Sequence, residues 1–169
     1  MLSRVVLDVA TRTRITWSSV NFINQSSPSS SNFKLLMQKC VSQSLWSQDE
    51  ARSSFLLDLY LAETGAVYLK LAEKSKGRKG EIFVDCRDFS KFSAGLKNVY
   101  ESGFASKECI SLGENHECQF FHLGNEIKIR RRGDRKSESG GLVFLSVGEV
   151  EEIVNTIREF EAVGLERVS

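Results

Sequence analysis

The sequence predicts an α+β fold made of two copies of one unit, in which four antiparallel strands are followed by one helix. Three observations lead to this prediction. The second half of the chain repeats the pattern of the first. Apolar residues alternate with period two along several segments, and each copy ends in a segment whose apolar residues have helical spacing. We therefore expect two ββββα repeats, with a helix covering the apolar face of each antiparallel sheet.

Composition is typical of a globular chain, with 41% hydrophobic and 27% charged residues among 169. The net charge of +1 hides an uneven distribution. Residues 70–80 hold five basic residues and one acid, Glu73. Residues 128–136 hold six basic residues and one acid, Asp134. These two basic blocks are candidate contacts for an anionic partner.

The N-terminal segment differs in composition from the rest. Residues 1–34 carry three arginines, a single acid at Asp8, and a Ser/Asn-rich stretch over 26–32. We expect residues 1–38 to be a flexible leader or a targeting segment, and 39–165 to be the folded domain. A plain tail would be compatible with the nucleus or cytoplasm, and a transit peptide would direct the chain to the mitochondrion. The sequence shows no apolar run of the ~18 residues that cross a bilayer, so no membrane partner is expected.

The four cysteines are Cys40, Cys86, Cys109 and Cys118. None forms a CxxC pair, and without a secretion signal buried thiols are expected rather than disulfides. The set Cys109, His116, Cys118 and His122 invites comparison with a zinc site, but its spacing does not match paired zinc ligands. We expect no metal and no small-molecule cofactor.

The first copy spans about residues 41–103. A short leading strand is expected near Leu45-Trp46. Alternating apolar residues then predict strands over 55–61, 67–71 and 82–86. A turn over 62–65 and a basic loop over 76–80 separate them. Asp88 is the expected N-cap of a helix that follows over 89–100.

The second copy spans about residues 107–163. Phe55 aligns with Phe120 and Leu45 with Ile110 at an offset of 65, and after a shorter hairpin the offset becomes 58. The expected strands lie around Ile110 and over 118–123, 127–129 and 142–147, with a helix over 149–160. One shared core is expected from these residues: Leu57, Leu59, Leu69, Leu71, Val84, Ile127, Ile129, Phe144, Val150, Val154 and Ile157.

Several runs resemble the PUR repeat. They are Phe55-Leu56-Leu57-Asp58, Tyr68-Leu69-Lys70-Leu71-Ala72-Glu73, the segment 92–103, and in the second copy Phe120-Phe121 and Ile127-Lys128-Ile129. The resemblance covers roughly residues 45–163 and includes the tandem arrangement. It implies two repeats intertwined into one PUR domain of Whirly-like architecture, binding of purine-rich single-stranded DNA or RNA, and a homodimer. The basic residue that usually follows the turn glycine is replaced here by Ala66, which shifts the expected binding toward the second copy and the two basic loops.

Aromatic and basic residues on an open sheet face are what sequence-tolerant binding of single strands requires. The candidate nucleic-acid-binding residues are Tyr68, Lys70, Lys74, Lys76, Arg78, Lys79, Phe83, Lys128, Arg130, Arg131, Arg132, Arg135 and Lys136. Tyr60, Tyr68 and Phe83 are expected to be exposed, which favours self-association. The alternative is a protein-interaction or dimerisation module without nucleic-acid binding. The sequence holds no Gly-rich phosphate loop, nucleophile elbow or HExxH motif, so an enzyme is not expected.

Overall fold

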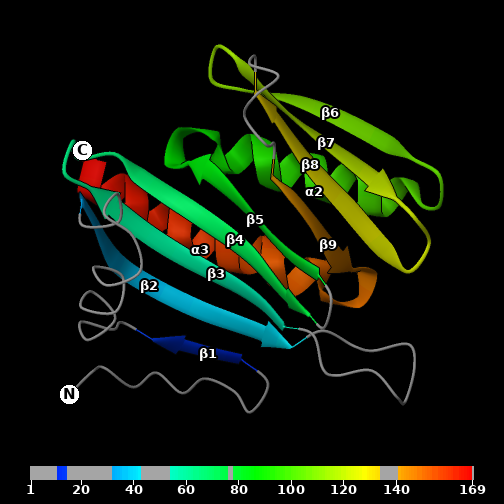
Figure 1. Cartoon of the computed structure of the whole chain (residues 1–169), viewed down its shortest axis with the longest axis horizontal. Coiled ribbons are helices and arrows are strands. Elements are labelled where there is room, and N and C mark those ends of the chain that lie inside the picture. The colour runs from blue at the N-terminus through cyan, green and yellow to red at the C-terminus, as the bar shows by residue number, and fades with distance from the viewer. Residues whose placement is uncertain (1–10, 15–31, 43–53, 76–77, 134–140, 169) are drawn as a thin grey trace.

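The computed structural model describes residues 11–14, 32–42, 54–75, 78–133 and 141–168 (Figure 1). The elements are, in chain order, β1 (Thr11–Arg14), β2 (Phe33–Ser42), β3 (Ser54–Ala62), β4 (Val67–Ser75), β5 (Arg78–Asp85), the 3-10 turn η2 (Cys86–Asp88), α2 (Phe89–Ser102), β6 (Lys107–Leu112), β7 (His116–His122), β8 (Glu126–Gly133), β9 (Leu142–Ser146), the 3-10 turn η3 (Val147–Glu149) and α3 (Val150–Val168). Neither described helix is long and apolar enough to span a membrane.

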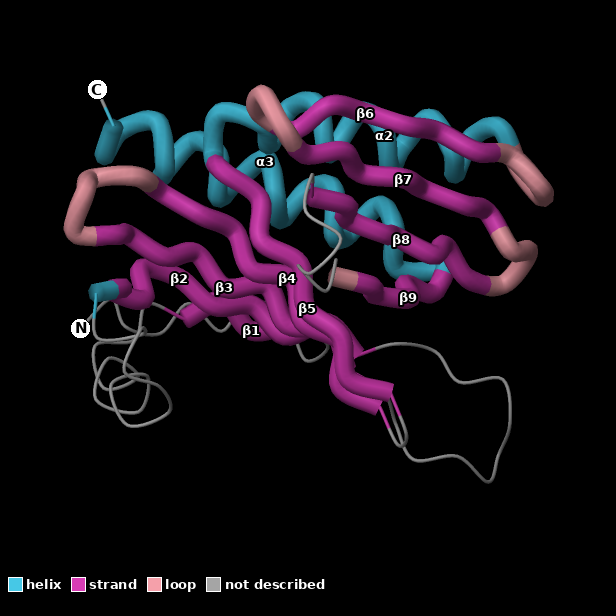
Figure 2. Tube along the Cα trace, turned by 45° about the horizontal axis from the view of Figure 1, so that its top comes forward, coloured by secondary structure: helices cyan, strands magenta, loops and turns pink. Residues whose placement is uncertain are grey.

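The strands form two antiparallel sheets. The first has the order β1-β2-β3-β4-β5, and the second has the order β6-β7-β8-β9. In each repeat four consecutive strands are followed by a helix, which confirms the predicted α+β class and the ββββα unit. Both helices lie on the same side of the two sheets, so the other face of each sheet carries no described helix (Figures 1 and 2).

Each helix covers the sheet of the other repeat. Helix α2 contacts β6 and β7, whereas α3 contacts β2, β3 and β4. The ring of Phe92 on α2 packs edge-on against Phe120 on β7, with 5.2 Å between centroids. At Gly95 the helix comes so close that an added Cβ would lie 2.8 Å from a ring carbon of Phe120. The repeats are therefore intertwined and share one core.

The core contains all of the residues predicted for it except one. Phe144 is half-buried, while its neighbours Val143 and Leu145 are fully buried. Pairing explains the error, because Val84 lies opposite Leu69 and Leu145 lies opposite Ile127. The true offset for the last strand is therefore 61 and not 58. An alignment error of three residues exchanges the two faces of a strand, because strand side chains alternate. In a helix, residues three apart lie on the same face, so the apolar pattern of the helices still matched and did not reveal the error.

The first strand also differs from the prediction. The expected strand near Leu45-Trp46 lies outside the described residues. The strand beside β3 is instead β2, in which Val41 pairs with Phe55 as Ile110 on β6 pairs with Cys118. Phe55 therefore corresponds to Cys118 and not to Phe120, so the offset for this strand is 63 and not 65. Strand β1 and the start of β2 fall within the expected leader, 1–38. The register shift between Leu35 and Met37 breaks the alternation along β2, which explains why period two did not predict it.

Candidate nucleic-acid interface

The open face of the second sheet carries a row of alternating lysine and phenylalanine. Strand pairing places Lys107 on β6 opposite Phe121 on β7, Phe121 opposite Lys128 on β8, and Lys128 opposite Phe144 on β9. Directly opposed residues on neighbouring antiparallel strands have Cβ atoms about 4.5–5.5 Å apart and interact side by side. We call these four residues the Lys-Phe row.

The ring of Phe121 is flanked by two cations. Lys107 Nζ lies 5.2 Å from the ring centroid, and Lys128 Nζ lies 5.4 Å from it. Both distances are within the range of a cation–π interaction, which is about 6 Å. Phe121 is half-buried and does not belong to the shared core. Part of the ring is therefore accessible, and it has positive charge on both neighbouring strands.

Two more cations extend this face beyond the Lys-Phe row. Arg130 is exposed and lies opposite Gln119 on β7 and Leu142 on β9. Arg132 is exposed and lies opposite Glu117, with 3.6 Å between Arg132 Nη1 and Glu117 Oε1. A solvent-exposed pair of this kind contributes only about 0–1 kcal/mol. In these rows of the second sheet, four cations face one described carboxylate, Glu117. Glu126 lies on the same face of β8, two residues before Lys128, so the described charges of this face remain net positive.

Arg131 lies on the other side of the sheet. It pairs with Cys118, whose side chain is buried in the core. Burial raises the pKa of the Cys118 thiol to about 12, and the nearby charge of Arg131 acts in the opposite direction. The basic run was predicted to bind as a block, but successive strand residues point to opposite faces. Arg131 is therefore separated from Arg130 and Arg132.

The equivalent row of the first sheet has different chemistry. Pairing aligns Gln38, Asp58, Lys70 and Phe83 across β2, β3, β4 and β5. Asp58 occupies the position that Phe121 has in the second sheet. It accepts hydrogen bonds from Gln38 Nε2 at 2.8 Å and from the Tyr60 hydroxyl at 3.1 Å. Lys70, the one cation of this row, forms an ion pair with Glu81 at 3.3 Å.

Burial dominates the electrostatics of this cluster. It raises the pKa of Asp58 above the usual value of 3.8, against the hydrogen bonds from Gln38 and Tyr60 and the charge of Lys70. The pKa of Tyr60 is raised as well, first by burial and then by the Asp58 carboxylate. Tyr60 was predicted to be exposed, but only 8% of it is accessible. Its hydroxyl is held by Asp58, so this ring is not a stacking platform.

Both tyrosines of the first sheet, Tyr60 and Tyr68, pack against the ring of Phe33. The ring of Phe33 on β2 meets Tyr60 and Tyr68 edge-on, with centroid distances of 6.3 and 6.2 Å. Tyr68 is half-buried as a result, whereas Phe83 keeps 39% of its surface exposed. Of the predicted aromatic contacts in this repeat, Phe83 is the more accessible.

The other predicted contacts are only partly described. Lys79 is exposed on β5. Lys74 and Arg78 lie at the ends of β4 and β5 with paired backbones, and their side chains are not among the described ones. Lys76, Arg135 and Lys136 lie outside the described residues.

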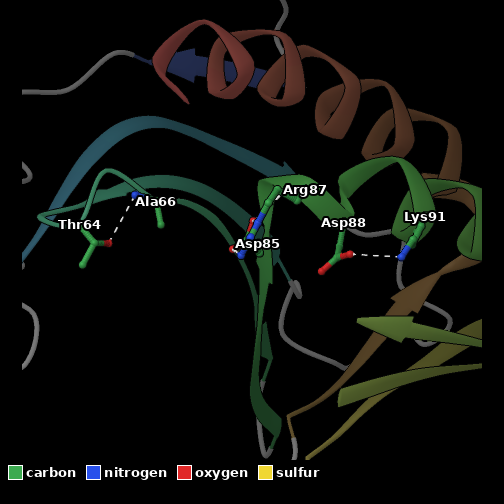
Figure 3. Close-up of polar contacts among 6 residues, drawn as sticks. All are labelled: Thr64, Ala66, Asp85, Arg87, Asp88 and Lys91. Carbon is green, nitrogen blue, oxygen red and sulfur yellow. Dashed lines mark hydrogen bonds and ion pairs between the residues drawn. The ribbon is translucent and has the colours of Figure 1, made fainter. Parts of the chain in front are cut away.

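At the end of β5 a basic side chain is held by an acid (Figure 3). Asp85 accepts hydrogen bonds from Arg87 Nε at 3.0 Å and from Arg87 Nη2 at 2.9 Å. These bonds are the main reason that the pKa of Asp85 is lowered. Asp85 also accepts a hydrogen bond from the backbone N–H of Arg87, and this bond caps η2. Asp88 is the predicted N-cap of α2, but its side chain makes no capping hydrogen bond. It forms an ion pair with Lys91 instead, with 3.7 Å between Asp88 Oδ1 and Lys91 Nζ. A second local bond nearby joins Thr64 to the Ala66 N–H.

The cysteines and histidines considered for zinc do not converge. Cys109 is exposed on the open face, in the row of Gln119, while Cys118 is buried on the helix side. Because adjacent strand residues alternate, these two thiols point to opposite faces. Within the described part of the chain, no group of three or more His, Cys, Asp or Glu side chains is placed to hold a metal ion.

The sequence matches no protein-family model, and no curated protein is significantly similar to it. What bears on function is therefore the chemistry of the second sheet and the difference between the two rows.

The sequence interpretation missed three of the four members of the Lys-Phe row. Lys107 and Phe121 were not candidate binding residues, and Phe144 was placed in the core. The signal that could have found them is hairpin pairing. The tight turn after His122 sets His122 opposite Ile127, and this register brings Phe121 opposite Lys128. The same reasoning applied to the turn after Leu112 brings Lys107 opposite Phe121.

Proposed function

We propose that this chain binds single-stranded nucleic acid, without catalysis, on the open face of its second sheet. The observation that carries the proposal is the Lys-Phe row. Bases stack on aromatic rings with a gain of about 1–3 kcal/mol each, while cations beside the rings meet the phosphates. A row with rings on alternate strands and an ammonium group between them offers both interactions along one line. The resemblance to the PUR repeat supports the same function.

The proposal places binding on the second sheet and not on the first. In the first sheet the central ring is replaced by Asp58, a carboxyl group that repels phosphate when it is ionised. Lys70 is already paired with Glu81, and Arg87 is held by Asp85. Lys70 was predicted to bind, but in the described part of this repeat its charge is offset by a neighbouring acid.

The row predicts tolerance of base sequence. A phenylalanine ring stacks on any base, and an ammonium group contacts any phosphate, so neither reads a base edge. The PUR resemblance implies a preference for purine-rich strands. Because DNA and RNA both present base faces and phosphates, the proposal covers single strands of either kind.

Fluorescence anisotropy with labelled DNA and RNA oligonucleotides, purine-rich and pyrimidine-rich, tests the proposal. Phe121→Ala should weaken binding by roughly 5- to 150-fold, which corresponds to about 1–3 kcal/mol of stacking. Lys97→Ala is the matched control, because Lys97 is exposed on α2 and pairs with Glu101 of the same helix. Equal affinities for Phe121→Ala and the parent, or no binding by the parent at low salt, would contradict the proposal.

A second candidate function is a protein-interaction module. The open face of the first sheet favours it, because it combines the partly exposed rings of Tyr68 and Phe83 with charges that are already paired. Such a surface suits a protein partner better than a phosphate backbone. Absence of nucleic-acid binding by the parent would favour this candidate.

A further inference from the structure

Strand β6 forms one edge of the second sheet, and no described strand pairs with its outer side. Its counterpart in the first repeat is β2, because Cys40 pairs with Leu56 in the same place as Cys109 pairs with Gln119. The outer side of β2 is occupied by the antiparallel strand β1. The repeat thus accepts an added antiparallel strand at this edge, and in the second repeat the place is open within the described chain.

The backbone groups at this edge can be identified from the ladder. The His122 N–H donates to the Ser106 carbonyl at 3.0 Å. Antiparallel hydrogen-bonded pairs alternate, so the N–H and C=O groups of Lys107, Cys109 and Ser111 point away from β7, toward the outer edge. An edge of this kind is a template for strand addition.

The side chains of Lys107 and Cys109 do not block the edge. Lysine often protects an edge strand, but the Lys107 ammonium lies over the ring of Phe121 and is therefore turned inward across the sheet. Cys109 Sγ lies 3.7 Å from Glu117 Oε2 on β7, so this side chain also leans toward the neighbouring strand.

We propose that a second copy of the chain binds here, by antiparallel pairing of β6 with the partner's β6 about Cys109. In this register Lys107 lies opposite the partner's Ser111, and Glu108 lies opposite the partner's Ile110. No like charges oppose each other, whereas a register centred on Glu108 would place two carboxylates face to face. The register centred on Cys109 also pairs all three outward-pointing residues, which gives the largest number of hydrogen bonds.

The resulting dimer would join the two open faces into one sheet. The two-fold axis of the dimer would pass between the two copies of Cys109, so the row of Cys109, Gln119 and Arg130 would continue into the same row of the partner. The two Lys-Phe rows would lie on opposite sides of this shared row. This interface does not depend on nucleic-acid binding, so each can be tested without the other. Phe144→Ala, on the opposite edge strand β9, should leave the dimer intact.

The mass of the full chain in solution tests the interface. Light scattering at tens of micromolar should give twice the chain mass of 19.0 kDa. Ser111→Pro removes an outward N–H without touching the β7 ladder, as proline is tolerated on edge strands, and should give a monomer. Ser111→Ala is the control and should remain dimeric. A monomeric parent overturns the proposal, as does a dimer that Ser111→Pro leaves unchanged while circular dichroism shows it folded.

Oxidative cross-linking provides a test that does not depend on the folding of Ser111→Pro. Opposed residues in a hydrogen-bonded antiparallel pair have Cα atoms about 5.5 Å apart, which suits a disulfide. Copper–phenanthroline, as the oxidant that accepts the two thiol electrons, should therefore yield a covalent dimer on a non-reducing gel. Cys109→Ser should abolish it and Cys40→Ser should not. Cross-linking through Cys40 alone, or none at all, overturns the proposed register.

Discussion

Gly80 and Gly141 occupy equivalent positions in the two repeats. Gly80 lies against the carbonyl group of Leu142, which follows Gly141, and Gly141 lies against the carbonyl group of Glu81, which follows Gly80. A Cβ on Gly80 would overlap the Leu142 carbonyl oxygen, and a Cβ on Gly141 would overlap the Glu81 carbonyl oxygen. The contact is thus repeated by a local two-fold relationship, as at an interface between identical subunits. Here the repeats cross backbone to backbone, which only residues without a side chain permit.

Gly80→Ala and Gly141→Ala should each destabilise the protein by about 1–3 kcal/mol or more, because the backbone that the new methyl group meets cannot rotate away as a side chain can. The free energy of unfolding from urea titrations measures the loss. Gly148→Ala is the control, since a Cβ there meets only Ser146 Oγ at 3.9 Å. Equal stability of all three variants would contradict the close crossing.

Phe120→Ala should cost about 3–5 kcal/mol, the usual range for a large core aromatic residue. Phe120 is fully buried against Phe92 of the other repeat, so both repeats should unfold in one transition in the parent and in the variant. Phe104→Ala is the control, because Phe104 is 76% exposed. Two separate calorimetric transitions would contradict the intertwined core.

Phe144→Ala should weaken single-strand binding, whereas Phe83→Ala should leave it nearly unchanged. The two residues hold equivalent positions in their rows, but only Phe144 belongs to a row with Phe121 at its centre. Anisotropy titrations of the two variants at the same salt concentration compare them directly. An equal loss in both would show that the first sheet takes part in binding.

Arg130→Ala should change the salt dependence of binding. Removing one cation that neutralises a phosphate should reduce the slope of log affinity against log salt by about 0.7, the value for single strands. Phe121→Ala should weaken binding with little change in slope, because stacking releases no counterions. Titrations at several salt concentrations separate the two effects. A parallel change in slope for both variants would contradict the division between charge and stacking.

Asp58→Asn should raise the free energy of unfolding at neutral pH. The pKa of Asp58 is raised in the folded state, so the folded protein binds a proton more tightly than the unfolded chain, whose carboxyl titrates near 3.8. Stability of the parent therefore falls as pH rises from about that value through the folded pKa. The advantage of the variant should disappear in acid. Urea unfolding across a pH series measures it.

Asp85→Asn should show the opposite sign, because the pKa of Asp85 is lowered by its bonds with Arg87. The stability that Asp85 contributes is fully present above the pKa that its carboxyl has in the unfolded chain. It is lost as the pH falls through the lower pKa of the folded state. The variant should therefore be less stable than the parent at neutral pH and equal to it in acid. The same pH dependence for both variants would contradict the different environments of the two carboxyls.

Local periodicity accounts for what could be predicted of the fold. The inward residues of β3, β4 and β8 follow from alternation within each strand, as for Leu57, Leu69 and Ile127. Phe144 was wrongly placed in the core because the length of the preceding loop decides which residues of β9 point inward. The error at β2 arose where a register shift interrupted the alternation.

The candidate site was harder to predict because its members come from four strands. Lys128 and Arg130 were identified as part of a basic run, but their separation from Arg131 depends on strand geometry. Lys107 and Phe144 join the row only through pairing with Phe121 and Lys128.

The sequence by itself determined the order of most strands and of both helices, the duplication and the inward face of most strands, because these depend on spacing between near neighbours. Only the tertiary structure decided that each helix covers the sheet of the other repeat. It also decided that Asp58 and Glu81 offset the charge near Lys70, whereas Lys107 and Lys128 flank the ring of Phe121. These relationships join residues on different strands, and cross-strand register, unlike periodicity, is not contained in any single segment.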